Sequence, residues 1–328
     1  MILESSRISY ISLRKTIHDE RFINTLKSKF IVNEFFLESS VTQSLSHALK
    51  DSQVIIASPL TSGVSLIPQT SKLPIVGVCL AYEINEDSKN SKVFKQLIDN
   101  ISRCDAIICD SKYIEKIIKE NFGFNGELLS IVYGCNQKLF LPVKFKNHNK
   151  LRIISTRNWT KIHSNQITID ALQILDNIGV SFQASLFGTG EELSEKVHSK
   201  AKEIGLNKVL LRGSYLNSSL PQLFENHEIY ISSAISDGTS ISLVEALSAG
   251  RICVCRDFAS NREWIEHGVT GFLFKNLNHL VEILLTLNSM SLIQREKISI
   301  AAKYSVLDRG NWNSYEPKLL KLISRYFN

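Results

Sequence analysis

The sequence predicts an α/β protein built from two doubly wound domains. Strand-like apolar segments alternate with amphipathic helical patterns along the chain, which favours parallel sheets covered by helices. A tract at 141–150, with proline, lysine, asparagine and histidine, interrupts this alternation and is expected to be a linker near residue 145. The 328 residues are enough for two hydrophobic cores. Ligands of such folds bind at the carboxyl ends of strands, and here also in a cleft between the domains.

Short apolar runs, often β-branched and bounded by turn residues, mark the expected strands. Before the linker they are 8–13, 30–36, 54–58, 75–80, 106–109 and 129–132. After it they are 151–155, 181–187, 209–212, 229–232 and 252–256. Apolar residues spaced by three and four mark helices between them, for example 110–122, 167–178, 191–204 and 220–226.

The composition limits the class of ligand. Hydrophobic residues make up 44% of the chain and charged residues 21%, which are values of globular proteins. The formal net charge of +6 is modest. It argues against a dedicated nucleic-acid binder and suits anionic small molecules or contact with an anionic membrane surface.

The cellular location is expected to be the cytoplasm, with peripheral contact at the inner face of the membrane. No apolar run approaches the length of a spanning helix, and the first ten residues lack the pattern of a signal peptide. The six cysteines include no C-x-x-C pair and mostly lie in strand-like runs. They are expected to be reduced core residues, without a metal site or a disulfide framework.

The segment "SDGTSISLVEALSAGR" carries two acids eight positions apart, Asp237 and Glu245. Ser240 is expected to cap a helix over 240–249, and Gly250 is expected to end it in the left-handed conformation. The apolar residues of this helix cover nearly its whole circumference, so we expect it to be buried on most sides.

A buried helix that opens on Asp-Gly-Thr-Ser presents backbone N–H groups and the positive end of its dipole to an anion. Glu245 lies about two turns inside and needs partners, which ligand hydroxyls would supply. The alternative stays equally open: Asp237 is a turn residue and Glu245 is a partly exposed helix acid.

A basic loop follows the strand at 151–155. Its sequence "TRNWTKIHS" brings Arg157 and Lys161 to the carboxyl end of that strand, together with His163. Two cations facing a helix mouth would hold a diphosphate, arginine through paired donors and lysine as a mobile point charge. Taken alone, the loop is preferentially interpreted as a solvated basic loop, and His163 is expected to be a hydrogen-bonded structural group.

A glycine-containing turn follows the strand at 181–187. In "GTGEEL", Gly188 and Gly190 permit a tight turn into the next helix. Leu193 occupies the third glycine position of a dinucleotide fingerprint, which disfavours an NAD-dependent oxidoreductase. We expect close backbone packing beside a ligand.

Taken in order, these segments resemble the retaining glycosyltransferases of family 4, the group 1 transferases, which have the GT-B fold. The resemblance covers 151 to about 275 through "FGTGEE", "LRGSYLNSSLPQLFENHEIYISSAISDGTSISLVEALSAG" and "NREWIEHGVTGFLF". It continues more loosely upstream through "RCDAIICDSKYIEKII" and "LLSIVYGCNQKLFLP". The acid pair of that family begins with glutamate, whereas here it begins with Asp237.

The resemblance implies two Rossmann-like domains. Residues 1–145 would form an acceptor-side domain, joined by a C-terminal helix within 312–328 that crosses back to it. Residues 146–311 would form the nucleotide-sugar-binding domain.

The resemblance also implies a role for each site residue in the second domain. Arg157 and Lys161 would neutralise the diphosphate and stabilise it as it departs, and Glu245 would accept hydrogen bonds from the ribose. Asp237 would hold hydroxyls of the transferred sugar. The remaining donor-binding positions are backbone groups of Gly188, Tyr215, Leu216, Gly238, Thr239 and Ser240.

The first domain departs from the family pattern. The first strand leads into "SLRKTIHDERF" without glycine, and the fourth ends in "VCLAYEINED". Glu83 stands roughly where the family carries a catalytic residue, and it is assigned as a catalytic carboxylate on the acceptor or sugar side. The alternative is a loop acid. His18 is expected to be a structural group.

Two hypotheses on function follow. The first is a metal-independent, hexosyl-type retaining glycosyltransferase without a cofactor, acting on a nucleotide sugar, with UDP-sugars favoured. Its acceptor would be a saccharide, a lipid-linked sugar or a glycoconjugate in cell-surface polysaccharide biosynthesis. The alternative is a non-catalytic partner subunit that binds nucleotide sugars, suggested by the departures in the first domain.

Overall fold

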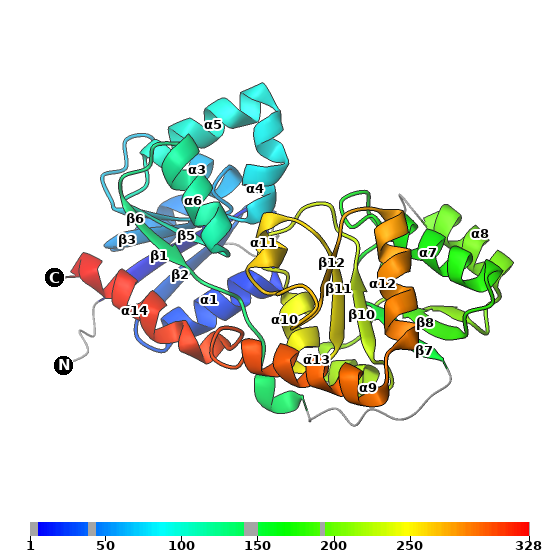
Figure 1. The fold of residues 1–328 in the computed structure, drawn as a ribbon. Helices are drawn as coiled ribbons and strands as arrows, with labels where there is room; N and C mark the ends of the chain where they lie inside the picture. The colour runs from blue at the N-terminus through cyan, green and yellow to red at the C-terminus, as the bar shows by residue number, and fades with distance from the viewer. Residues whose placement is uncertain (1–5, 39–43, 141–149, 191–193, 328) are drawn as a thin grey trace. The chain divides into compact units, whose positions relative to one another are not determined.

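The computed structural model describes residues 6–38, 44–140, 150–190 and 194–327. The chain divides into two compact units, coloured in sequence order in Figure 1. Unit 1 comprises Met1–Tyr133 and Trp312–Asn328, and unit 2 comprises Gly134–Asn311. The expected linker at 141–150 lies, except for Lys150, outside the described residues.

Unit 1 contains a six-stranded parallel sheet in the order β2-β1-β3-β4-β5-β6. The strands are β1 (Arg7–Ser12), β2 (Ile31–Phe36), β3 (Val54–Ser58), β4 (Ile75–Val78), β5 (Ala106–Cys109) and β6 (Glu127–Ser130). The helices are α1 (Ile17–Lys27), α2 (Leu45–Leu49), α3 (Ser62–Leu66), α4 (Ala81–Asn85), α5 (Ser91–Ser102), α6 (Lys112–Asn121) and α14 (Glu316–Ser324), with short 3₁₀ turns at Asp87–Lys89, Trp312–Ser314 and Arg325–Phe327.

Unit 2 contains a second six-stranded parallel sheet in the order β12-β11-β10-β7-β8-β9. The strands are β7 (Leu151–Ser155), β8 (Phe182–Leu186), β9 (Val209–Leu211), β10 (Ile229–Ser232), β11 (Ile252–Arg256) and β12 (Phe272–Phe274). The helices are α7 (Asn165–Asn177), α8 (Ser194–Ile204), α9 (Leu220–Glu225), α10 (Ile241–Ser248), α11 (Ala259–Arg262), α12 (Leu277–Ser289) and α13 (Leu292–Ser305), with 3₁₀ turns at Gln137–Leu139 and Asn217–Ser219.

Each sheet has its own buried core, and the predicted α/β class is confirmed. In unit 1, Ile55 and Ile107 from the strands pack with Leu97 of α5. In unit 2, Ile153 and Ile231 belong to the corresponding cluster. The sheet of unit 2, read from β9, has the strand order of dinucleotide-binding domains.

Three strands differ from expectation by more than one residue. Strand β4 ends at Val78 rather than at residue 80. Phe272–Phe274 forms β12, which was not predicted because a run of three residues is too short to show a period. Strand β6 runs from Glu127 to Ser130 rather than from residue 129 to 132, although Ile131 still donates its N–H to the carbonyl of Cys109.

The cysteines and the helix lengths can be checked directly. All six cysteines are buried free thiols. Among the described residues, no helix is long and apolar enough to cross a bilayer. Within the same residues, no group of three or more histidine, cysteine, aspartate or glutamate side chains is placed to hold a metal ion.

Candidate functional site

The candidate site of unit 2 lies at the reversal of strand order between β7 and β10. From β7 the sheet continues in one direction to β8, and from β10 it continues in the other direction to β11. In open parallel sheets, ligands bind at such a reversal, outside the carboxyl ends of the strands. The loops that leave the carboxyl ends of β7 and β10 carry Arg157 and Asp237.

Helix α10 begins where the sequence predicts. The Ser240 side chain accepts a hydrogen bond from the backbone N–H of Leu243, and Gly250 has a φ of 65°. Most of the helix is buried, whereas Glu245 is half-buried. The predicted cap, the left-handed glycine and the burial of the helix are confirmed.

Arg157 connects the two loops. Its Nη2 donates to Asp237 Oδ2 at 2.6 Å, and its Nη1 donates to the Ser240 hydroxyl at 2.7 Å. Nη1 also lies 3.1 Å from the Ser242 hydroxyl, to which Tyr230 donates at 2.8 Å. The arginine side chain is only 11% exposed, compared with 26% for that of Asp237. A fixed positive charge therefore lies at the mouth of α10.

The environment keeps this arginine charged. Burial, the largest single influence, lowers the pKa of Arg157, but the charge and hydrogen bond of Asp237, together with Tyr230 and Cys255, raise that pKa above its ordinary value. The family resemblance assigned the two residues to different parts of a ligand, whereas the structure joins them in an ion pair. A diphosphate at this site would share the guanidinium with Asp237.

Lys161 and His163 occupy the same loop as Arg157. Lys161 is exposed. His163 Nδ1 lies 2.9 Å from the Thr160 hydroxyl, and burial, followed by the charge of Arg157, lowers the pKa of His163 to about 4. A neutral, hydrogen-bonded imidazole agrees with the structural role expected for His163.

The two glycines of the loop after β8 allow backbone to pack against backbone. A Cβ at Gly188, where φ is 138°, would lie 2.4 Å from the carbonyl oxygen of Arg157. A Cβ at Gly190, where φ is 137°, would lie 2.7 Å from that of Trp159. The expected close packing is confirmed, while residues 191–193, including Leu193, lie outside the described residues.

Tyr215 lies close enough to Glu245 and Arg157 to interact with the charges of both. Burial raises the pKa of the Tyr215 hydroxyl, the Glu245 carboxylate raises it further, and the Arg157 charge opposes both. The Tyr215 ring contacts that of Phe187 edge-on, with centroids 5.6 Å apart. The Leu216 side chain is 76% exposed. The structure thus brings the expected phosphate and ribose positions to one edge of the sheet.

The start of α10 has further support that the sequence did not reveal. Asp237 Oδ1 accepts from the N–H of Gly238, and Thr239 accepts from Trp264 Nε1 at 3.2 Å. Asn165, 3% exposed, donates to the carbonyl of Arg157 at 2.8 Å. Trp264 belongs to the "NREWIE" motif, which was the available signal for it, whereas Asn165 had none.

Glu83 of unit 1 is fully buried. Its Oε1 accepts from the N–H and hydroxyl of Thr61 at 2.5 and 2.6 Å, and its Oε2 accepts from the N–H groups of Leu60 and Leu80 at 3.1 and 2.8 Å. Burial raises the pKa of Glu83 to about 7, against the effect of these hydrogen bonds. The carboxylate joins the turn after β3 to the start of α4. Its catalytic role stays a prediction.

Comparisons with known proteins identify relatives of this arrangement. Residues 152–289 match the family model described as Glycosyl transferases group 1. A comparison with curated proteins gave no match.

Solved structures resemble the chain over almost its whole length. They include a glycosyltransferase from Rickettsia africae (14% identity, 99% of each chain covered, TM-score 0.74). Sucrose-phosphate synthase from Thermosynechococcus elongatus has 12% identity over 98% of this chain and 99% of that chain, with a TM-score of 0.81. Anabaena HepE in complex with UDP-glucose has 18% identity over 97% and 99%, with a TM-score of 0.77. The fold is that of the GT-B glycosyltransferases.

Proposed function

From the match of unit 2 to the group 1 glycosyltransferases, we propose that this chain transfers a sugar from a nucleotide sugar, with retention of configuration. The acceptor is a saccharide, a lipid-linked sugar or a glycoconjugate in cell-surface polysaccharide biosynthesis. The transfer takes place in the cytoplasm, at the inner membrane face when the acceptor is lipid-linked. The UDP-glucose complex of HepE supports a uridine donor.

The observation that carries the proposal is the Arg157 cluster at the mouth of α10, with Glu245 and Tyr215 beside it. The diphosphate takes the place beside Arg157, where the guanidinium and the helix dipole both favour negative charge. The ribose hydroxyls then meet Glu245. Asp237, next to the diphosphate, meets hydroxyls of the transferred sugar.

The reaction breaks the bond between the anomeric carbon and the phosphate oxygen, whose electron pair leaves with the diphosphate. The acceptor hydroxyl attacks from the same face, and its proton passes to the departing phosphate oxygen. Arg157 and Lys161 oppose the negative charge that grows on this oxygen, so their effect is largest in the transition state. These two cations perform the stabilisation for which other transferases use a metal.

The burial of Glu83 favours a second candidate. In unit 1, the expected catalytic carboxylate of Glu83 is buried and hydrogen-bonded to the backbone of the same unit. This arrangement suits a partner subunit that binds a nucleotide sugar without transferring it. Turnover by the purified chain separates the two functions.

The proposal is tested with UDP-, GDP-, ADP- and CMP-sugars in a thermal unfolding panel. A ligand that binds only the native state raises the melting temperature. At a concentration of 100 times its dissociation constant, it adds about 2.7 kcal/mol to the free energy of unfolding. We expect a UDP-sugar to raise it most, and the purified chain to release UDP when an acceptor mixture is added. Binding without release of UDP would favour the partner subunit, and an unchanged melting temperature with all four donors would contradict both functions.

Replacing Glu245 with alanine is expected to weaken UDP binding by roughly 1–3 kcal/mol, the contribution of hydrogen bonds to a charged group. The Michaelis constant should rise while turnover changes less, because ribose contacts hardly alter during the reaction. Calorimetric titration of UDP measures the effect. Glu282→Ala, at an exposed position of α12, is the matched control. Equal UDP affinity in folded Glu245→Ala and Glu282→Ala would contradict the role of Glu245.

A further inference from the structure

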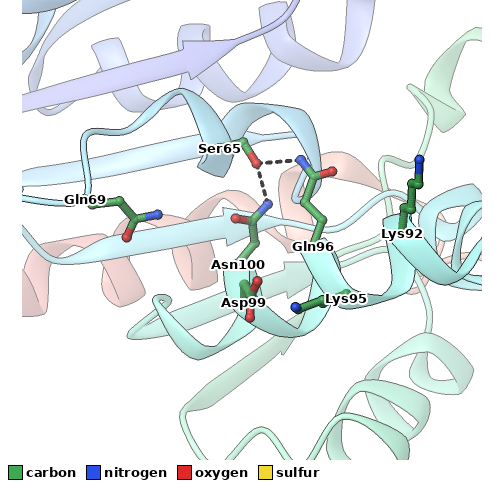
Figure 2. A pocket seen from close by; sticks show the side chains of 7 residues that line it. All are labelled: Ser65, Gln69, Lys92, Lys95, Gln96, Asp99 and Asn100. Atoms are coloured by element: carbon green, nitrogen blue, oxygen red, sulfur yellow. Dashed lines mark hydrogen bonds between the residues drawn. The ribbon is translucent and has the colours of Figure 1, made fainter.

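Unit 1 has a cavity of about 350 Å³ between α3 and α5, shown in Figure 2. One wall comes from Ser65 of α3 and from Gln69 just after it. The opposite wall is one face of α5, formed by residues 92, 95, 96, 99 and 100, which follow helical spacing. The cavity therefore lies in the helical layer, and none of its lining residues belongs to the candidate site of unit 2.

The floor of the cavity is a fixed hydrogen-bond cluster. Asn100 is 3% exposed, and its Nδ2 donates to the carbonyls of Leu60 and Thr61 and to the Ser65 hydroxyl, at 3.0, 2.7 and 2.9 Å. Gln96 Nε2 donates to the same hydroxyl at 2.7 Å and to Thr61 O at 3.2 Å. Because the acceptors are carbonyls and a shared hydroxyl, both amides are held in one orientation.

This orientation leaves hydrogen-bond acceptors facing the cavity. Figure 2 shows the amide oxygens of Gln96 and Asn100 turned away from Ser65. The Ser65 hydroxyl donates its own hydrogen bond to the backbone carbonyl of Thr61 at 2.7 Å. The cluster therefore offers carbonyl oxygens to a ligand and keeps its N–H and O–H groups for the protein.

The rim adds both signs of charge. Lys92, Lys95 and Asp99 are exposed on α5, and Gln69 is exposed opposite them. Within the described part of the chain, their side chains form no hydrogen bond or ion pair with another residue. These four side chains are available to a ligand and supply ammonium and amide donors beside the acceptors of Asp99.

Such a mixture selects one kind of ligand. A bare anion brings acceptors only and would meet the Asp99 carboxylate and two amide oxygens. An apolar ligand would find no apolar side chain among the lining residues. A hydroxyl group both donates and accepts, so several hydroxyls on one molecule can satisfy acceptors and donors together. The volume lies at the lower end of the range for ligand sites, about 300–1,000 Å³.

We propose that this cavity binds a short saccharide through its hydroxyl groups, as a site separate from the candidate donor site of unit 2. The amide oxygens of Asn100 and Gln96 and the carboxylate of Asp99 accept hydrogen bonds from hydroxyl groups of the saccharide. The side chains of Lys92, Lys95 and Gln69 donate hydrogen bonds to its hydroxyl oxygens. The proposal concerns binding alone and does not depend on sugar transfer by the chain.

The test follows the side-chain amide resonances of Gln69, Gln96 and Asn100 by NMR in the full chain. The probes are neutral oligosaccharides of glucose, galactose, mannose and N-acetylglucosamine, with inorganic phosphate at matched ionic strength as a separate arm. We expect at least one oligosaccharide to shift these resonances to saturation, and phosphate to leave them unchanged. Asp99→Ala should weaken this binding roughly tenfold or more, as expected for hydrogen bonds to a charged group. Asp99→Asn, which keeps an acceptor oxygen, should weaken it less.

Glu120→Ala, at an exposed position of α6 in the same unit, is the matched control and should bind like the parent. Unchanged amide resonances with every oligosaccharide at its highest soluble concentration would overturn the proposal. A response to phosphate alone would assign the cavity to anions instead. Equal binding by Asp99→Ala and Glu120→Ala would also overturn it, because the saccharide would then be bound elsewhere.

Discussion

Replacing Arg157 with alanine is expected to lower the rate constant of transfer by about 100-fold or more, the typical cost of losing one preorganised charge stabiliser. The guanidinium is fixed by Asp237 and Ser240, so it needs no reorganisation when charge develops on the departing phosphate. An interaction made mainly in the transition state lowers kcat and kcat/KM together and leaves KM unchanged. Steady-state kinetics with the preferred donor measures both constants.

The structure supplies the controls for this experiment. Arg262→Ala removes an arginine of the same unit that is 63% exposed and pairs with Asp257, and it should leave kcat unchanged. Ser242→Ala keeps the charge of Arg157 and removes one of its partners, so its effect should be smaller than that of Arg157→Ala. A higher KM with an unchanged kcat in Arg157→Ala would show that the arginine only binds the donor.

Lys161 is expected to act in the same direction with a smaller effect. Its side chain is exposed, and water and salt screen an exposed charge more than a buried one. The sequence placed Arg157 and Lys161 together as two cations of one loop. The structure shows that they differ in burial, because the Arg157 side chain is 11% exposed whereas Lys161 is exposed. Burial depends on the neighbouring strand, and the spacing of the two residues in the sequence does not reveal that neighbour.

The candidate site of unit 2 was accessible from sequence because its parts are local. Ser240 and Gly250 bound one helix, and Gly188 lies in one turn, so backbone rules predicted their conformations. The pairing of Arg157 with Asp237 joins residues 80 positions apart. It follows from the adjacency of β7 and β10, and alternation of strands and helices does not predict strand order.

The environment of Glu83, in contrast, could not be predicted from the sequence. An acid after a strand has the same sequence signal whether it faces a substrate or the protein. The decisive partners, Leu60 and Thr61, lie more than 20 residues upstream in the turn after β3. The cavity in unit 1 was missed for the same reason, since α3 and α5 contribute separate walls and neither segment carries a motif.

The contribution of Glu83 to the free energy of unfolding is expected to fall as the pH rises from about 4.5 to about 7. Burial is the largest influence on its carboxyl group and raises its pKa from 4.5 to about 7 in the folded chain. The folded state therefore binds this proton more tightly than the unfolded state. The resulting stabilisation is fully present below pH 4.5 and is lost as the pH rises through the folded pKa. A shift of about 2.5 units corresponds to about 3 kcal/mol.

Denaturant unfolding of the parent and of Glu83→Gln between pH 4 and 8 measures this contribution. Glutamine cannot ionise, so the parent should lose stability relative to Glu83→Gln as the pH rises, by up to about 3 kcal/mol. Thr61→Val removes the hydrogen bond that most opposes burial, so in that variant the pKa of Glu83 should rise further and the loss should extend to higher pH. Glu120→Gln, at an exposed acid of the same unit, should follow the parent at every pH. A difference between the parent and Glu83→Gln that stays constant from pH 4 to 8 would mean that the folded chain does not raise this pKa. The four backbone and hydroxyl donors would then fully compensate the burial of the carboxylate.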